Sequence, residues 1–314
     1  MSKPISPTPL ILRGQRFDAA RPAVMGIVNR TPDSFYAPAR HADNEAAVAR
    51  AVQMVTEGVG IVDVGGVRAG QEGDWVEAAE EIDRVRPVLA ALRDRVPHLI
   101  LSLDTWRAEV ADACAGLVDL VNDTWQGADP ELVGVAAATG AGYVVSHTGG
   151  LPPRTDPVDI DYGPDDAVVE DVLRVLRDGA ARARAAGLPR ERILVDPTLD
   201  FGKTTLDSLA LVAHTARIVE LGYPVLQAIS RKDFVGETLD LPIDERLEGT
   251  LAATAIAAWQ GATVFRAHDV RATRRVLDMV ASIRGDRPPS LSVRGRPTTD
   301  ASGSGKDTAG DFAG

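Results

Sequence analysis

The chain has 314 residues, 45% of them hydrophobic, and a formal net charge of −11 at pH 7, so it can bury the core of one large domain. The negative charge argues against nucleic acid and anionic membrane as partners, because their phosphate groups would repel it. There is no apolar run long enough to cross a bilayer, no secretory signal pattern in residues 1–21 and only one cysteine, so we expect a cytoplasmic protein.

Apolar runs alternate with helical patterns from residue 10 to residue 284. A short hairpin is predicted around Gly14, over residues 10–17. Strands are predicted for eight apolar runs, over residues 24–28, 61–66, 99–103, 117–121, 142–145, 192–195, 224–228 and 263–265. Helices are predicted over residues 43–57, 75–95 with an interruption or kink at Pro87, 108–115, 130–139, 164–186, 206–221, 243–259 and 270–283.

Eight strands that are each followed by a helix predict an α/β fold, the closed TIM (β/α)8 barrel. An open, doubly wound sheet is the alternative, but it would leave edge strands, whereas all eight runs look buried. We expect residues 1–21 to form a hairpin cap and residues 22–284 to form the barrel. Residues 285–314 are rich in Gly, Ser, Thr, Pro and Asp and lack periodicity, so they are predicted to be a disordered tail.

Polar residues recur where the predicted strands end. In a TIM barrel these ends converge on one face, which is where such enzymes carry out their chemistry. Each polar residue alone has a structural explanation, because a single strand-end Asp more often caps a turn or bonds local backbone. Their recurrence predicts a shared site, and the residues expected there are Asn29, Asp63, Asp104, Asn122, His147, Asp196, Lys232, Arg266 and His268.

The residue types at these strand ends indicate a ligand with a flat, polar ring. The carboxylates and amides of Asp104, Asn122 and Asp196 can pair with ring NH and carbonyl groups, and they penalise a ligand that lacks them.

The cationic residues at these ends favour an anion such as diphosphate. Arg266, His268 and Lys232 can donate charge-assisted hydrogen bonds to it, and Lys203 is expected to be a further cation at the edge of the site. Asn29 offers an oxygen to a magnesium ion that phosphate oxygens already hold. Together these residues predict a transferase whose leaving group is pyrophosphate.

Seven motifs along residues 21–284 resemble, in order, those of dihydropteroate synthase. They are Asn29-Arg30-Thr31-Pro32-Asp33-Ser34-Phe35, Asp63-Val64-Gly65-Gly66, Ser102-Leu103-Asp104-Thr105, Asn122-Asp123, Asp196-Pro197 with Phe201-Gly202-Lys203, Ser230-Arg231-Lys232, and Arg266-Ala267-His268-Asp269-Val270. The resemblance implies that p-aminobenzoate is joined to 6-hydroxymethyl-7,8-dihydropterin diphosphate, with release of pyrophosphate, in folate biosynthesis. It also implies a homodimer.

The resemblance further implies a role for each matching residue. The pterin would be held by Asp104, Asn122, Asp196 and Lys232, the diphosphate by Arg266 and His268, and the magnesium by Asn29. Ser230 and Phe201 would border the p-aminobenzoate site, which sulfonamide-like analogues could occupy, and Arg68 would stand in for an arginine of the second loop. The catalytic residues would be Asp104, Lys232 and Arg266, with Asp104 beside the cationic methylene that loss of diphosphate leaves.

Two loops depart from the family pattern. Val67-Arg68-Ala69-Gly70 replaces residues that include a Ser and a Thr, and Thr198-Leu199-Asp200 replaces a Gly-Ile-Gly run. Trp125 takes the place of a small residue. Two functions therefore stay open: a working synthase with altered loops, which the surviving strand-end residues favour, and an inactive or weakly active paralogue with another or a regulatory role. A pterin-dependent methyltransferase is a third, disfavoured because it would not need Arg266 with His268.

Overall fold

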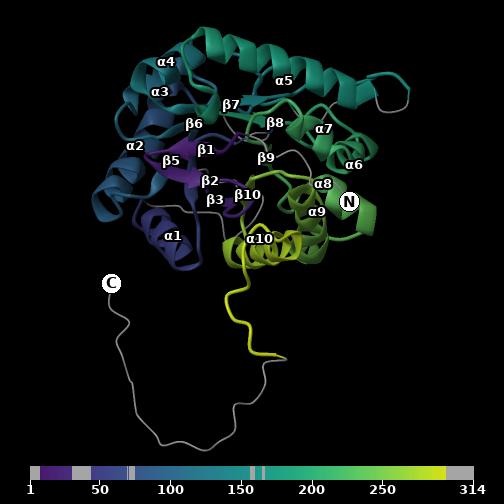
Figure 1. Cartoon of the computed structure of the whole chain (residues 1–314). Helices are drawn as coiled ribbons and strands as arrows, with labels where there is room; N and C mark the ends of the chain where they lie inside the picture. Colours follow the sequence, from purple (N-terminus) through teal and green to yellow (C-terminus); the bar gives the residue numbers. More distant parts are fainter. Residues whose placement is uncertain are drawn as a thin grey trace, which may run out of the picture.

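The computed structural model describes residues 8–29, 44–68, 70, 75–155, 160–164 and 167–294. Its eight-stranded parallel sheet consists of β3 (Ala23–Asn29), β4 (Ile61–Gly65), β5 (Ile100–Asp104), β6 (Leu120–Asn122), β7 (Gly142–Ser146), β8 (Ile193–Asp196), β9 (Leu226–Gln227) and β10 (Val264–Ala267). The spatial order is β8-β7-β6-β5-β4-β3-β10-β9, so each strand lies beside its neighbour in the chain except where β3 meets β10. This arrangement confirms the predicted TIM barrel (Figure 1).

The barrel closes between β8 and β9 through an isolated bridge. Val195 pairs with Val225 in parallel, and the Val195 amide donates to the Pro224 carbonyl at 2.9 Å. Strand β9 is only two residues long, whereas the prediction covered residues 224–228. The seam between β8 and β9 is therefore a short junction in the ring of strands.

Alternate strand residues face the interior of the barrel, because successive side chains in a strand point to opposite sides. The antiparallel hairpin of β1 (Leu10–Leu12) and β2 (Gln15–Phe17), which was predicted, closes the base of the barrel with Leu10, Leu12 and Phe17. The strand residues in the same interior cluster are Ala23, Met25, Ile61, Ile100, Leu120, Val144, Leu194, Leu226 and Val264. Further along the same inward faces the residues turn polar, and this polar end is called the mouth below.

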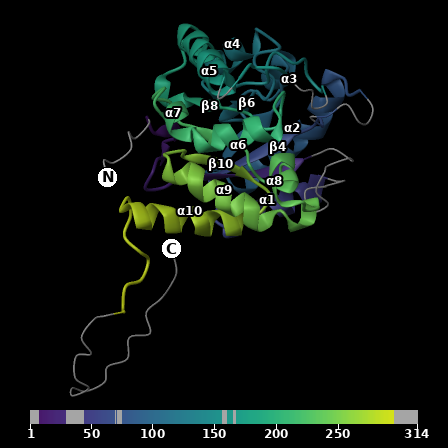
Figure 2. The same cartoon turned by 90° about the vertical axis from the view of Figure 1, so that its right-hand side faces the viewer.

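Helices surround the sheet and pack against the outward faces of its strands (Figures 1 and 2). They are α1 (Asn44–Thr56), α2 (Ala78–Arg95), α3 (Ala108–Ala113), α4 (Leu132–Thr139), α5 (Ala167–Ala185), α6 (Thr205–Ala213), α7 (Thr215–Val219), α8 (Asp233–Leu239), α9 (Leu247–Trp259) and α10 (Val270–Arg284), with the 3₁₀ turns η2 (Arg190–Arg192) and η3 (Ile243–Glu245). Across the described ranges, no helix is both long and apolar enough to span a membrane.

Three helix predictions need correction. The helix expected over residues 206–221 is divided into α6 and α7, since Gln260 accepts a hydrogen bond from the Ala216 amide and donates one to the Val212 carbonyl, both at 3.0 Å. The helix expected from residue 243 begins as η3, and its α-helical part starts at Leu247. The third correction is helix α8, which was not predicted. Helix α2 was predicted with an interruption or a kink at Pro87, and it continues through that residue as one helix.

The last helix, α10, ends at Arg284, and Gly285 follows it with a left-handed φ of 76°. Residues 285–294 form neither helix nor strand. The rest of the predicted tail, from residue 295, lies outside the described residues, and the division of the chain at residues 21 and 284 stays a prediction.

Candidate functional site

The strand register brings the predicted site residues together at the mouth. Asn29 on β3 pairs with Gly65 on β4, Gly65 pairs with Asp104 on β5, and Asp104 pairs with Asn122 on β6. On the other side of the barrel, Ser146 on β7 pairs with Asp196 on β8. Residues far apart in the sequence therefore share one layer, as the strand-end pattern predicted.

An ion network fills the centre of this layer. The Arg266 guanidinium donates through Nε to Asp63 Oδ2 and through a terminal nitrogen to Asp104 Oδ2, both at 2.7 Å. Asn122 Nδ2 donates to the same Asp63 oxygen at 3.1 Å. The cation that was predicted to hold diphosphate is therefore bonded to two carboxylates of its own chain.

Two buried acceptors in the network have no donor. Within the described part of the chain, Asp63 Oδ1 and Asn122 Oδ1 accept no hydrogen bond, and both residues are fully buried. An unsatisfied buried acceptor costs about 1–3 kcal/mol, so these oxygens favour a ligand that brings NH groups to them. Their chemistry fits the predicted flat heterocycle.

Asp104 has a strongly perturbed acidity. Burial raises the pKa of its carboxyl to about 7, and the carboxylates of Asp63 and Glu81 act in the same direction against the opposing Arg266 guanidinium. Glu81, which is buried behind this layer on α2, is ion-paired to Arg107 at 2.5 Å. Perturbed acidities of this kind cluster at functional sites, although ion-pair networks also produce them.

On the opposite side of the mouth, Asp196 and Lys232 face the loop of residues 198–201. Asp196 Oδ1 accepts the Thr198 amide at 2.7 Å, and the Lys232 ammonium donates to the Leu199 carbonyl. Burial raises the pKa of Asp196 and lowers that of Lys232, while the attraction between the two charges opposes both shifts. The lysine that was predicted to hold the pterin is thus bonded to a backbone oxygen of this loop.

Phe201, which was predicted to border the p-aminobenzoate site, lies between two neighbours. Its ring meets Trp125 edge-to-face, with ring centroids 5.4 Å apart. The Lys232 nitrogen lies 4.7 Å from the centroid of the Phe201 ring. Trp125, which takes the place of a small residue in the family pattern, is almost fully buried and packs beside Phe201.

Ser230 and His268 form a pair at the ends of β9 and β10. The Ser230 oxygen lies 3.0 Å from His268 Nδ1 and accepts the His268 amide at 3.2 Å. Burial lowers the pKa of His268 to about 4, and the Arg266 charge acts in the same direction. His268 is therefore neutral near pH 7, and it would bind an anion by donating an N–H rather than by charge.

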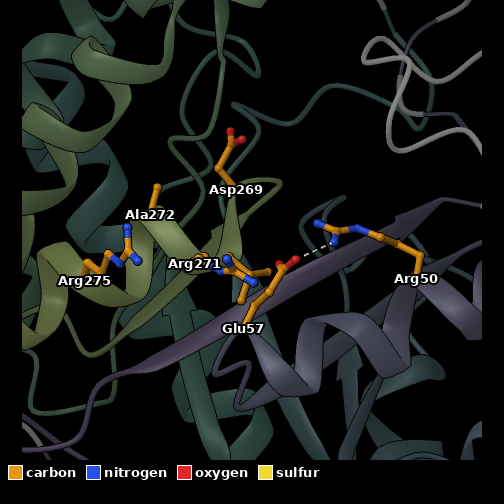
Figure 3. A pocket seen from close by; sticks show the side chains of 7 residues that line it. Arg50, Glu57, Asp269, Arg271, Ala272 and Arg275 are labelled. Carbon is orange, nitrogen blue, oxygen red and sulfur yellow. Dashed lines mark hydrogen bonds and ion pairs between the residues drawn. The ribbon is translucent and has the colours of Figure 1, made fainter.

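A surface hollow of about 300 Å³ lies between α1 and the start of α10 (Figure 3). Its charged lining residues are Arg50, Glu57, Asp269, Arg271 and Arg275. The Arg50 guanidinium donates to Glu57 Oε1 at 3.0 Å and to the main-chain oxygen of His268 at 3.2 Å. Arg50, which lines the hollow, thus holds the main chain at His268.

Lys203 and His147 hold loops rather than face the mouth. The buried Lys203 ammonium donates to the carbonyls of His147, Thr198 and Phe201 at 2.8–3.0 Å. Lys203, which was expected to be a cation at the edge of the site, therefore binds backbone oxygens of its own chain. His147 is also fully buried and bonds through Nε2 to Asp171 at 2.9 Å.

The remaining predicted residues are Asn29 and Arg68. Asn29 is the last residue of β3, and Arg68 lies three positions after the end of β4. Among the described residues, no group of three or more His, Cys, Asp or Glu side chains could hold a metal ion. A single amide oxygen at Asn29 therefore fits only a magnesium ion that brings most of its ligands with it, as a diphosphate complex would.

The sequence predicted no role for two residues of the site, Asp63 and Asp200. Asp63 is central to the ion network, and the signal for it was a carboxylate at an inward position of an otherwise apolar strand, between Ile61 and Gly65. Asp200 accepts the Asp233 amide at 2.7 Å, directly beside Lys232. No local pattern indicates that contact, because the two residues are 33 positions apart.

Known proteins resemble this chain in sequence and in fold. The chain matches the family described as "Pterin binding enzyme" over residues 25–268. It is 53% identical over 287 residues to "Inactive dihydropteroate synthase 2" of Mycobacterium leprae (strain TN), covering 91% of this chain and 98% of the relative. It is 35% identical over 272 residues to "Dihydropteroate synthase" of Escherichia coli (strain K12), covering 86% and 95%. The structure of a dihydropteroate synthase from Coxiella burnetii in complex with pteroic acid superimposes with a TM-score of 0.79 at 30% identity, covering 89% of this chain and 99% of that one.

Proposed function

Because this chain belongs to the pterin-binding enzyme family and is of the dihydropteroate synthase type, we propose that it binds 6-hydroxymethyl-7,8-dihydropterin diphosphate at the mouth. We further propose that it joins this substrate to p-aminobenzoate only slowly. The observation that carries the proposal is that Arg266 and Lys232, the two cations best placed to act on the substrate, are both bonded to groups of their own chain.

The pterin ring would take the place now filled by the ion network. Asp63 Oδ1 and Asn122 Oδ1 offer acceptors to its NH groups, and Asp196 offers a buried carboxylate from the opposite side. Because Asp63 and Asn122 are fully buried beside Arg266, the ring reaches them only after the guanidinium moves away. That displacement opposes binding.

The reaction would need a negative group near the carbon that loses diphosphate. Asp104 lies at the mouth and would stabilise the positive charge that develops there, an interaction that is stronger in the transition state than in the ground state. The diphosphate would be held by Arg266, His268 and Arg68. Magnesium, when bound with the diphosphate at Asn29, would supply positive charge to the leaving group.

The p-aminobenzoate would lie against Phe201 and Ser230. In the observed arrangement the Phe201 ring already contacts Trp125 and the Lys232 ammonium, which limits the room for an arylamine. The M. leprae relative bears the word "inactive" in its name, which agrees with slow transfer. Sulfonamide-like analogues would compete for the same place.

The proposal is tested by measuring binding and coupling separately. We expect titration with the pterin diphosphate to release heat only when magnesium is present. We expect labelled dihydropteroate to form at least about a hundredfold more slowly than with the E. coli enzyme assayed alongside, since loss of one preorganised group typically costs 10²–10³ in rate. Absence of any pterin binding would contradict the proposal.

A fully active synthase is the second candidate. Its support is that Asp104, Asn122 and Asp196, which were predicted to hold the pterin, are all present at the ends of neighbouring strands. A coupling rate equal to that of the E. coli enzyme would favour this candidate over slow transfer.

We also propose that the protein is a cytoplasmic homodimer. Support for the dimer comes from helices α9 and α10, which lie side by side (Figures 1 and 2). Four hydrophobic side chains on these helices are 45–62% exposed, namely Ile256, Trp259, Met279 and Ile283. A second copy of the chain would cover them.

A further inference from the structure

The loop of residues 198–201 has an unusual backbone. Thr198 and Asp200 adopt left-handed φ angles of 52° and 69°. A β-branched residue such as threonine is a genuine outlier in this region, and such strain persists only where surrounding contacts hold it. The contacts that hold this loop therefore indicate which neighbouring groups require its conformation.

Several contacts fix the loop to the barrel. Thr198 Oγ1 accepts the His147 amide at 3.2 Å and donates to the Asp196 carbonyl at 3.1 Å. At the other end, the Asp200 amide donates to Ser208 Oγ at 3.1 Å, and the Ser208 hydroxyl lies 3.2 Å from Asp200 Oδ1. The loop thus has one defined position above the mouth.

In this position the loop contacts Lys232 through Leu199 and Phe201, and it contacts the next residue of the chain, Asp233, through Asp200. The Leu199 carbonyl accepts the Lys232 ammonium, and the Phe201 ring lies beneath the same nitrogen. Asp200 Oδ2 accepts the amide of Asp233 at 2.7 Å, which fixes the backbone next to Lys232. The lysine is therefore held at both its side chain and its backbone.

The charges around the ammonium favour the same arrangement. The carboxylates that act on Lys232 are Asp200, Asp196 and Asp233, and of these Asp200 has the largest effect, while Arg266 repels it. Asp196 was predicted to hold the pterin, whereas Asp200 lies on the loop itself. Asp200 is thus the group whose removal would release Lys232 without removing a predicted ligand of the pterin.

We propose that Asp200 is an internal counter-ion that keeps Lys232 on the loop of residues 198–201 and away from the pterin, and so sets the pterin affinity of this chain. This inference rests on the proposed function, because it presupposes that the mouth binds a pterin. Asp200 acts through Lys232 and is a positioning residue.

The first experiment measures the binding of pteroic acid by calorimetric titration to the unaltered protein, Asp200→Gly, Lys232→Ala and the double variant. We expect Asp200→Gly to bind about tenfold more tightly, since a charge-assisted hydrogen bond to the freed ammonium is worth at least this factor. Lys232→Ala is expected to change affinity less than about twofold in the unaltered protein but about tenfold in the Asp200→Gly background. Equal losses in the two backgrounds would overturn the inference.

Asp240→Gly is the matched control. Asp240 is an exposed aspartate with a left-handed φ of 55° at the end of α8, so its replacement gives the same backbone relief without changing the loop of residues 198–201. We expect it to leave pteroic acid affinity unchanged. Asp200→Asn removes the charge but keeps the side-chain size, and it should reproduce most of the gain; a gain confined to Asp200→Gly would show that shape, not charge, is responsible.

A second readout does not depend on the pterin. Limited acetylation followed by peptide mass spectrometry should label Lys232 several-fold faster in Asp200→Gly, while the buried Lys203 is unchanged. Faster labelling without pteroic acid binding by any variant would overturn the proposed function but would still support the effect of Asp200 on the accessibility of Lys232. Unchanged labelling would overturn the inference alone.

Discussion

Arg266 lies between Asp63 and Asp104, and its removal would leave two carboxylates at the mouth without their cation. We expect Arg266→Ala to lower the free energy of unfolding by about 3 kcal/mol, because an unpaired buried charge is costly. Urea denaturation would measure this. Arg217→Ala, which breaks an exposed pair with Glu170, should have a much smaller effect, because solvent screens exposed ion pairs. Similar losses of unfolding free energy in the two variants would contradict a stabilising role of Arg266 between Asp63 and Asp104.

The buried imidazole of His147 predicts a pH dependence of stability. Burial lowers its pKa from an ordinary 6.5 to about 4, so the unfolded chain binds the proton more readily than the folded one. The contribution of the neutral His147 side chain to the free energy of unfolding is therefore complete above pH 6.5 and is lost as the pH falls toward 4. Between pH 7 and pH 5, the loss of unfolding free energy should be smaller in His147→Gln by on the order of 2 kcal/mol.

Denaturation curves at the two pH values test this expectation. The exposed residue His98 supplies the control, since His98→Gln should leave the difference between pH 7 and pH 5 unchanged. If His147→Gln kept the full difference, another group would be responsible, with His268 as the next choice because its pKa is also lowered to about 4.

At the level of single residues, the sequence predicted which side chains meet but not how they pair. Asp104, Asn122 and Arg266 could be placed at the mouth because each follows an apolar strand of a parallel barrel. That Arg266 would bond to Asp63, and Lys232 to Leu199, depends on distances between loops that no periodicity encodes. The same is true of Lys203, whose three carbonyl partners come from two different loops.

Among the structural elements, the hairpin of β1 and β2 has the clearest packing role. Phe17 is 1% exposed and lies so close to Gly60 that a Cβ there would be 2.9 Å from its ring. We expect Phe17→Ala to cost about 3–5 kcal/mol of unfolding free energy, through lost burial and a cavity at the barrel base. Denaturant titration is the measurement. The neighbouring exposed residue provides the comparison, because Arg16→Ala should stay within about 1 kcal/mol.

Secondary structure was predicted well where a buried strand or a long amphipathic helix dominates the local sequence, as in β3 and α10. The prediction failed where a side chain that is distant in the sequence determines where a helix begins or ends. Helix α8 is short, and its Gly236 lies against Arg246, which also donates to the Arg231 carbonyl and to Asp233. The break between α6 and α7 depends on Gln260, which belongs to the segment after α9.

For the whole molecule, the exposed side chains of α9 and α10 predict self-association. Introducing charge there with Met279→Glu and Ile283→Lys should convert the proposed dimer to a monomer, because burying either charge against a second copy is unfavourable. Analytical ultracentrifugation measures the mass directly. Ala138→Glu on α4, on the far side of the barrel in Figure 1, should leave the mass unchanged. A monomeric unaltered protein would contradict the proposal.

The junction between β8 and β9 has a mechanical consequence for the whole barrel. Lys232 follows β9 and the residues that hold it follow β8, so their contact spans the short junction at its open end. The hydrogen bond from Lys232 to the Leu199 carbonyl therefore adds a side-chain link between the segments that follow β8 and β9. A ligand that binds Lys232 must break this hydrogen bond at the junction where the barrel has only one backbone bridge. Ligand binding and the rigidity of the barrel therefore depend on the same side chain.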